Sequence, residues 1–74
     1  MDIQMWRDSR GRAESAAEAL RAAMALLGLP EAAAAKVRPV VTHSGASYVD
    51  LGMIRSDHAE QLAQAIRMAL IRVH

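Results

Sequence analysis

The chain has 74 residues, a formal net charge of +1 at neutral pH and no cysteine. This length allows one domain at most, and the lack of cysteine excludes a disulfide framework. The small net charge gives no strong field for steering nucleic acid or a membrane surface, and no apolar run is long enough to span a membrane. A chain this short buries only about 60% of its unfolded surface, so association is the expected supplement to its stability. The lack of cysteine also fits a cytoplasmic location.

The first half of the chain is predicted to contain an arm and two helices. Residues 1–12 are mostly polar and are interpreted as an N-terminal arm that ends in a loop or a helix entry. Residues 13–27 are predicted to form a helix, because apolar residues recur at steps of three and four without interruption. Gly28 follows at the position where a left-handed helix cap is favoured. Pro30 suits the start of a short second helix over residues 30–36.

Residues 37–43 and 47–54 are predicted to form an antiparallel β-hairpin, since apolar residues alternate with others in both segments. The favoured register places the apolar residues of both strands on one face, and it leaves residues 44–46 as the loop. Gly45 supplies the positive φ that such a loop requires. The expected opposite pairs are His43 with Ser47, Val41 with Val49, Pro39 with Leu51, and Val37 with Met53.

A final helix is predicted over residues 57–72, with Asp57 and Glu60 in a capping arrangement. The order of elements predicts a small two-layer α+β domain over residues 13–74, in which the helices pack on one face of a two-stranded antiparallel hairpin. Pairing of the second strand with its own copy would complete a four-stranded sheet in a homodimer. The main apolar stripe of the final helix consists of Leu62, Ile66, Ala69, Leu70 and Val73.

The polar stretch over residues 42–61 holds most of the chemically reactive side chains. His43, Ser44, Ser47 and Asp50 are the residue types of a hydrolytic site, in which a serine needs a base and an orienting carboxylate. The predicted register, however, places Asp50 on the face opposite Ser47, and an exposed hairpin tip has no walls to exclude water. Turn formation and helix capping explain these residues, so no catalytic residue is assigned.

A metal site is not expected, because no two imidazoles stand at the close spacing that metal ligands usually show. No phosphate-binding loop or dinucleotide motif is present either, so the sequence predicts no cofactor. The three imidazoles belong to His43, His58 and His74.

Two segments have features of nucleic-acid binding. Residues 20–37 have the spacing of a helix-turn-helix, but the second helix begins with Pro30 and Glu31 and continues with four alanines, which cannot read base edges. The N-terminal arm is the better candidate, since arginines hold phosphates and an aromatic ring stacks on a base. The residues concerned are Trp6, Arg7, Arg10 and Arg12.

The sequence therefore favours a non-enzymatic protein-interaction, regulatory or accessory module that acts as a homodimer and contacts an unidentified protein partner. The alternative is a nucleic-acid-binding regulator that uses the arginine-rich arm. The expected interaction surface combines the outer edge of the second strand with an apolar patch at the end of the final helix. Its residues are Tyr48, Asp50, Gly52, Met68, Ile71 and Val73.

Overall fold

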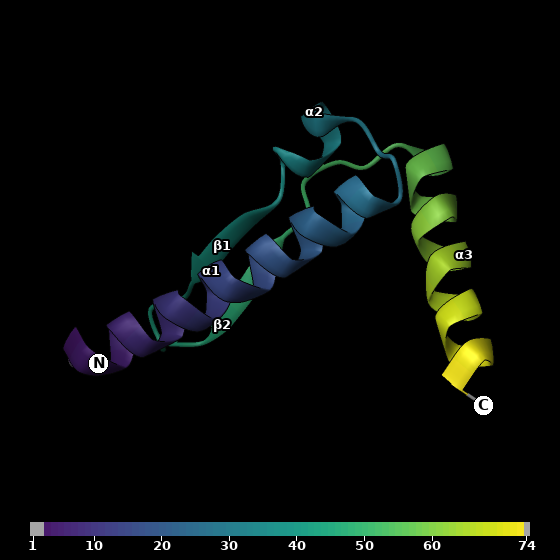
Figure 1. Ribbon diagram of the computed structural model, residues 1–74. Coiled ribbons are helices and arrows are strands. Elements are labelled where there is room, and N and C mark those ends of the chain that lie inside the picture. The colour runs from purple at the N-terminus through teal and green to yellow at the C-terminus, as the bar shows by residue number, and fades with distance from the viewer. Residues whose placement is uncertain (1–2, 74) are drawn as a thin grey trace.

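The computed structural model describes residues 3–73, and residues 1–2 and 74 lie outside the described part. The chain forms a long helix, a short helix, a two-stranded antiparallel hairpin and a final helix (Figure 1). The predicted α+β class and order of elements are confirmed. The elements are α1 (Ile3–Leu26), α2 (Glu31–Ala34), β1 (Arg38–Val41), β2 (Ser47–Asp50) and α3 (Ser56–Val73).

Helix α1 begins at Ile3, ten residues before the predicted start at residue 13, so residues 3–12 belong to the helix and are not a separate arm. Side-chain pairs one turn apart support these first turns. Gln4 donates to the carboxylate of Asp8 over 3.1 Å, and the arginine at position 10 pairs with the glutamate at position 14 over 2.8 Å. Tertiary packing adds to them, because Ser9 is buried against the hairpin. Local polarity thus misled the prediction, since this part of α1 is held by hydrogen bonds rather than by apolar burial.

The chain leaves α1 through a glycine cap, as predicted. Gly28 has a φ of 81°, and the amide of Leu29 donates to the carbonyl of Met24 over 3.1 Å. Pro30 then precedes α2, whose four helical residues make it shorter than the predicted range of 30–36. The chain turns over residues 35 and 36 before it enters β1.

The hairpin has a register shifted by two residues from the prediction. An even shift keeps every side chain on its predicted face, because side chains alternate with a period of two. The shift follows from a longer loop over residues 42–46, in which Thr42 donates its amide to the carbonyl of Ala46 and accepts the amide of Ala46 with Oγ1. The predicted positive φ of Gly45 is confirmed at 89°. The observed pairs are Arg38–Asp50, Pro39–Val49, Val40–Tyr48 and Val41–Ser47.

Strand β2 ends at Asp50, so the predicted continuation to residue 54 is wrong. The carboxylate of Asp50 accepts the amide of Gly52 over 2.8 Å, and Gly52 has a φ of 66°. This side-chain turn bends the chain away from the sheet. Leu51 and Met53, which were expected to face inward, are therefore exposed.

The core lies where α1 crosses one face of the hairpin. Its buried residues are packed by partly buried neighbours from α2, β2 and the first half of α3. The guanidinium of Arg21 closes one side of this core by donating twice to the carbonyl of Val37, over 2.8 and 3.2 Å. The core cluster consists of Ala17, Met24, Leu29 and Val37.

Helix α3 lies near the C-terminal end of α1 and diverges from the hairpin. The molecule therefore has an open, elongated shape (Figure 1). Only α1 therefore covers the hairpin in the way predicted for all helices, whereas α2 packs against α1 and the core cluster. The Cα radius of gyration is 14.4 Å, against about 11 Å for a compact domain of this length. The chain exposes 5660 Å², against roughly 4,500 Å² for a compact monomer of this mass. Much surface that a compact domain would bury is thus open.

Candidate protein-binding groove

The polar residues of the hairpin tip serve the fold. Ser47 donates its hydroxyl to the backbone carbonyl of Ser9 over 2.6 Å, and the hydroxyls of Thr42 and Ser44 lie 2.9 Å apart. Asp50 lies on the other face of the hairpin, where it accepts an amide and pairs with an arginine over 3.7 Å. A serine bonded to a carbonyl, with the carboxylate on the opposite face, does not form a nucleophile–base–acid chain.

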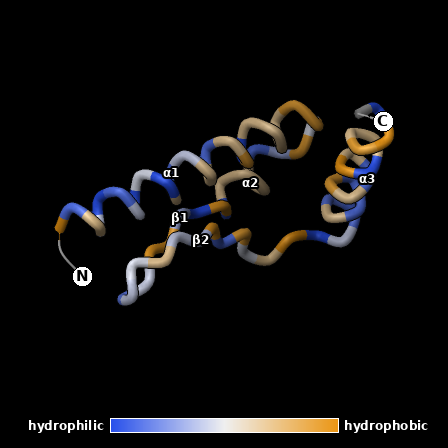
Figure 2. The backbone as a smooth tube through the Cα atoms, turned by 90° about the horizontal axis from the view of Figure 1, so that it is seen from below, coloured by the Kyte–Doolittle hydropathy of each residue, from blue (hydrophilic) through white to orange (hydrophobic). Residues whose placement is uncertain are grey.

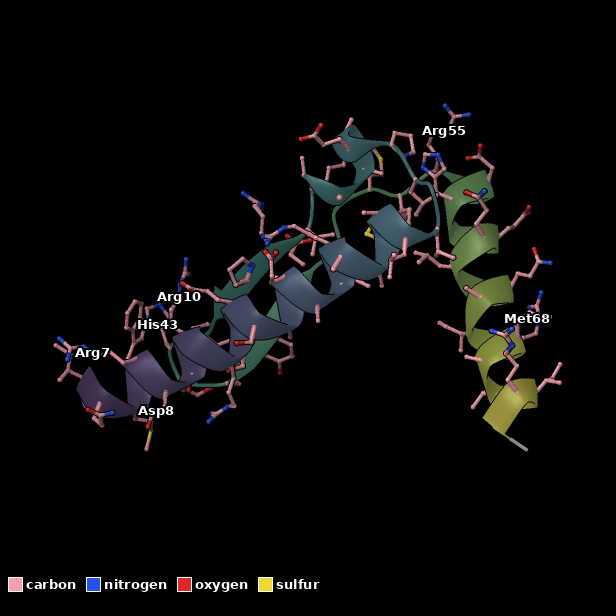
Figure 3. All side chains as sticks on the ribbon, in the orientation of Figure 1. Arg7, Asp8, Arg10, His43, Arg55 and Met68 are labelled. Carbon is pink, nitrogen blue, oxygen red and sulfur yellow. The ribbon has the colours of Figure 1, made fainter. Side chains whose placement is uncertain are left out.

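The histidines are distributed over distant elements. His43 is exposed at the hairpin tip beside the N-terminal part of α1 (Figure 3), whereas His58 lies in the first turns of α3. Within residues 3–73, no group of three or more histidine, aspartate or glutamate side chains is placed to hold a metal ion.

The junction between α1 and the hairpin centres on Ser9, which is 1% exposed. Its hydroxyl donates to the carbonyl of Gly45 over 2.6 Å, and its own carbonyl accepts the hydroxyl of Ser47 over 2.6 Å. The guanidinium of Arg12 donates to the Ser9 hydroxyl over 3.4 Å. This cluster could not be predicted from the sequence, because a serine in a polar segment is usually exposed.

The arginines of the proposed nucleic-acid arm lie on helix α1 and do not form one patch. Arg7 and Arg10 are three residues apart and share one side of the helix, as Figure 3 shows, with Asp8 on the other side. Arg10 is paired with Glu14, and Arg12 lies about 160° from Arg10 around the helix axis. The partly exposed Trp6 belongs to the same helical turns. This arrangement weakens the nucleic-acid alternative.

A groove of about 360 Å³ separates the C-terminal turns of α1 from α3 and carries no charged lining residue. We call it the α1–α3 groove. Figure 2 shows the apolar colour at the end of α1 and along α3. Leu26, on one wall, is 90% exposed, and Ile66, on the other, is 61% exposed. The lining residues are Leu20, Ala23, Leu26, Leu27, Leu62, Ala65, Ile66 and Ala69.

The predicted stripe of α3 therefore forms a wall of this groove rather than packing on the hairpin. Among the partly buried apolar residues in the described part of α3, Leu62 packs against the core cluster. The sequence identified the stripe but could not tell what the stripe faces.

The residues of the interaction surface predicted from the sequence are dispersed over several elements. Tyr48 is exposed on the outer face of the hairpin. Asp50 and Gly52 form the turn that ends β2. Met68 and Ile71 are exposed on α3, outside the groove lining. Val73 is in α3, but its side chain lies outside the described part.

A smaller hollow of about 200 Å³ lies between α2 and the start of α3, with three basic side chains among its lining. Two of these side chains are engaged within the chain. Lys36 donates to the carbonyl of Met53 over 3.3 Å, and Arg55 pairs with Asp57 over 3.1 Å. The third, His58, is half-buried. This hollow is a weaker candidate than the groove, because two of its three basic side chains are already engaged within the chain.

Comparison with known proteins finds no matching family model, no similar curated protein and no similar solved structure. Between residues 3 and 73, no helix combines the length and apolar content that crossing a membrane requires.

Proposed function

We propose that this protein is a non-enzymatic interaction module that acts through contact with another protein chain at the α1–α3 groove. One observation carries the proposal: a groove lined only by uncharged, apolar side chains stays open in a chain with a very small core. Contiguous apolar surface of this kind marks an interaction site in a protein that works in water. An adaptor, a regulator or an accessory subunit in the cytoplasm would use such a surface.

The energetics support this proposal. Burying one large apolar side chain contributes about 1.5–3 kcal/mol, and the chain leaves that contribution unused at Leu26, Ile66 and Leu70. A domain of this length has a total stability of only about 4–11 kcal/mol. Covering the groove would therefore add an amount comparable with the stability of the isolated fold.

The experiment uses the absence of cysteine from the sequence. Leu26→Cys places a single thiol in the groove, and Met53→Cys places one elsewhere. The two positions are 90% and 82% exposed, so an isolated chain would expose both thiols to a similar degree. Maleimide labelling rates would be measured for each full-length variant in undisturbed lysate of the cells that make the protein, and normalised to the rate after denaturation.

We expect Leu26→Cys to react several-fold more slowly than Met53→Cys, because a bound chain shields the groove. Equal rates at the two positions would show that nothing covers the groove and would overturn the proposal. Selective protection of Met53→Cys would instead point to the hollow beside α2, and the groove would lose its assigned role.

A further inference from the structure

We infer that the occupant of the α1–α3 groove is α3 of a second copy, so that two chains each lay α3 into the groove of the other. This inference rests on the proposed function and names its partner. The resulting dimer has a two-fold axis, and its contact consists of the same residues on both chains. It replaces the four-stranded sheet expected from the sequence with a bundle of two α1 and two α3 helices.

Helix α3 carries an exposed apolar ridge of the kind that the groove can accept. Ile66 and Leu70 are four residues apart, so they form one ridge on α3, and they are 61% and 58% exposed. A groove without charged lining accepts such a ridge without desolvating a charge. Because the ridge and the groove belong to the same chain, a two-fold contact covers both at once.

The positions of two charged side chains on α3 also favour a second copy. Glu60 and Arg67 are each two residues from a groove-lining position, Leu62 and Ala69 respectively, and so lie on nearly the opposite side of the helix. Both charged groups would stay in water after α3 enters the partner groove, whereas Arg72, seven residues after Ala65, lies on the groove side in the last turn, beyond the last lining residue. An occupant with a charged ridge would lack this match, whereas a second copy has it by construction.

The exposed apolar area also suits a second copy. Leu26, Ile66 and Leu70 each expose more than half of their surface, which supplies a substantial share of the roughly 800 Å² per partner of a stable interface. The edge of β2 offers less, because the strand has only four residues and ends at the Asp50 turn. The total exposed surface, larger than that of a compact monomer, fits a chain that buries one face against its copy.

The test is sedimentation equilibrium of the purified full-length chain over a micromolar dilution series. We expect a dimer for the natural sequence. Ile66→Asp places a charge in the groove and is expected to weaken association by at least about a hundredfold. Ile71→Asp is the matched control, because Ile71 has the same side chain on the same helix, is 68% exposed and does not line the groove. It should remain dimeric.

Leu70→Asp tests the ridge separately from the groove wall and should also give monomers. Far-ultraviolet circular dichroism and Trp6 fluorescence would confirm that each variant keeps the fold of α1 and the hairpin. A dimer that resists both Ile66→Asp and Leu70→Asp uses another surface, such as the β2 edge, and overturns the inference.

A monomer at all concentrations also overturns the inference, and the thiol measurement then separates the two proposals. If Leu26→Cys is still shielded in lysate, another protein occupies the groove and the proposed function stands. If Leu26→Cys reacts as fast as Met53→Cys, both proposals fail.

Discussion

The two ends of α1 meet the rest of the chain in opposite ways. At the hairpin end, a serine and small alanines are buried, and Ser9 is closed in by hydrogen bonds with the loop and with β2. At the other end, Leu26 is almost fully exposed and faces α3 across an open groove. The large apolar side chain of Leu26 thus stays outside the core, although Met24 of the same helix is buried in it. The hairpin end of α1 is closed by contacts within the chain, and the groove end leaves apolar surface open.

Side-chain size explains the closed end. Ala13 and Ala17 are fully buried, so the backbone of α1 approaches the hairpin closely. Close approach brings Ser9 within hydrogen-bonding distance of Gly45, but it buries little apolar area. By contrast, Leu26 at the end of α1 and Ile66, Leu70 and Ile71 on α3 are large apolar residues that stay exposed.

The largest expected effect is a difference in the free energy of unfolding between substitutions at two positions in the last turn of α1. Met24 is buried and Leu26 is exposed, so Met24→Ala is expected to lower the free energy of unfolding by roughly 2–4 kcal/mol through cavity formation. Leu26→Ala should change it by less than about 0.5 kcal/mol. Both substitutions are made in the Ile66→Asp background, in which association does not contribute. Urea unfolding followed by circular dichroism measures both.

Similar losses from the two substitutions would contradict the contrast between the ends of α1, since Leu26 would then belong to a core within the chain. With Ile66 restored, Leu26→Ala is expected to weaken association instead. Sedimentation of that variant would detect this change.

A smaller effect is expected at the Ser9 junction. Ser9→Ala removes the hydroxyl donor to the Gly45 carbonyl and leaves that part-buried oxygen without this partner, at a cost of about 1–2 kcal/mol. Ser15→Ala is the control, because Ser15 is exposed on the same helix and the change has the same helix propensity. Urea midpoints of the two variants measure the difference. Equal midpoints would mean that the junction does not hold α1 to the hairpin.

The fold class and order of elements could be predicted because glycine and proline mark the ends of periodic segments. The left-handed conformations of Gly28, after α1, and Gly45, in the hairpin loop, were predicted for the same reason. Alternation in the strands fixes which face each residue occupies, but it does not distinguish registers that differ by two residues. That choice depends on the hydrogen bonds of Thr42 across the loop, which the pattern of apolar residues does not contain.

Of the predicted interaction residues, none with a described side chain lines the candidate groove. The apolar stripe of α3 follows from spacing, but its partner depends on how the connection after β2 places α3. Gly52 was predicted to lie in a strand, but it has a positive φ and bends this connection. The helical state of residues 3–12 was missed because the burial of Ser9 depends on a loop 36 residues further along the chain.

The smallest expected effect concerns α3, which has little contact with its own chain and so depends on its first turn. Desolvation raises the pKa of Asp57, but the opposing effects of Arg55, His58 and the His58 amide prevail and lower it from 3.8. Ionised Asp57 accepts that amide over 3.0 Å, and its negative charge interacts favourably with the positive N-terminal end of the α3 dipole. Since the folded-state pKa is lowered, this stabilisation is complete above the unfolded pKa and is lost as the pH falls through the folded one.

Asp57→Asn is therefore expected to reduce protection of the α3 amides from hydrogen exchange slightly at neutral pH. The difference from the natural sequence should shrink as the pH falls below about 4. In the dimer the contribution of this turn should be smaller than in Ile66→Asp, because the partner groove would hold α3 along its length. A difference that is independent of pH would show that the lost interaction is not that of an ionised carboxylate. A difference as large in the dimer as in the monomer would show that α3 stays open to water after association.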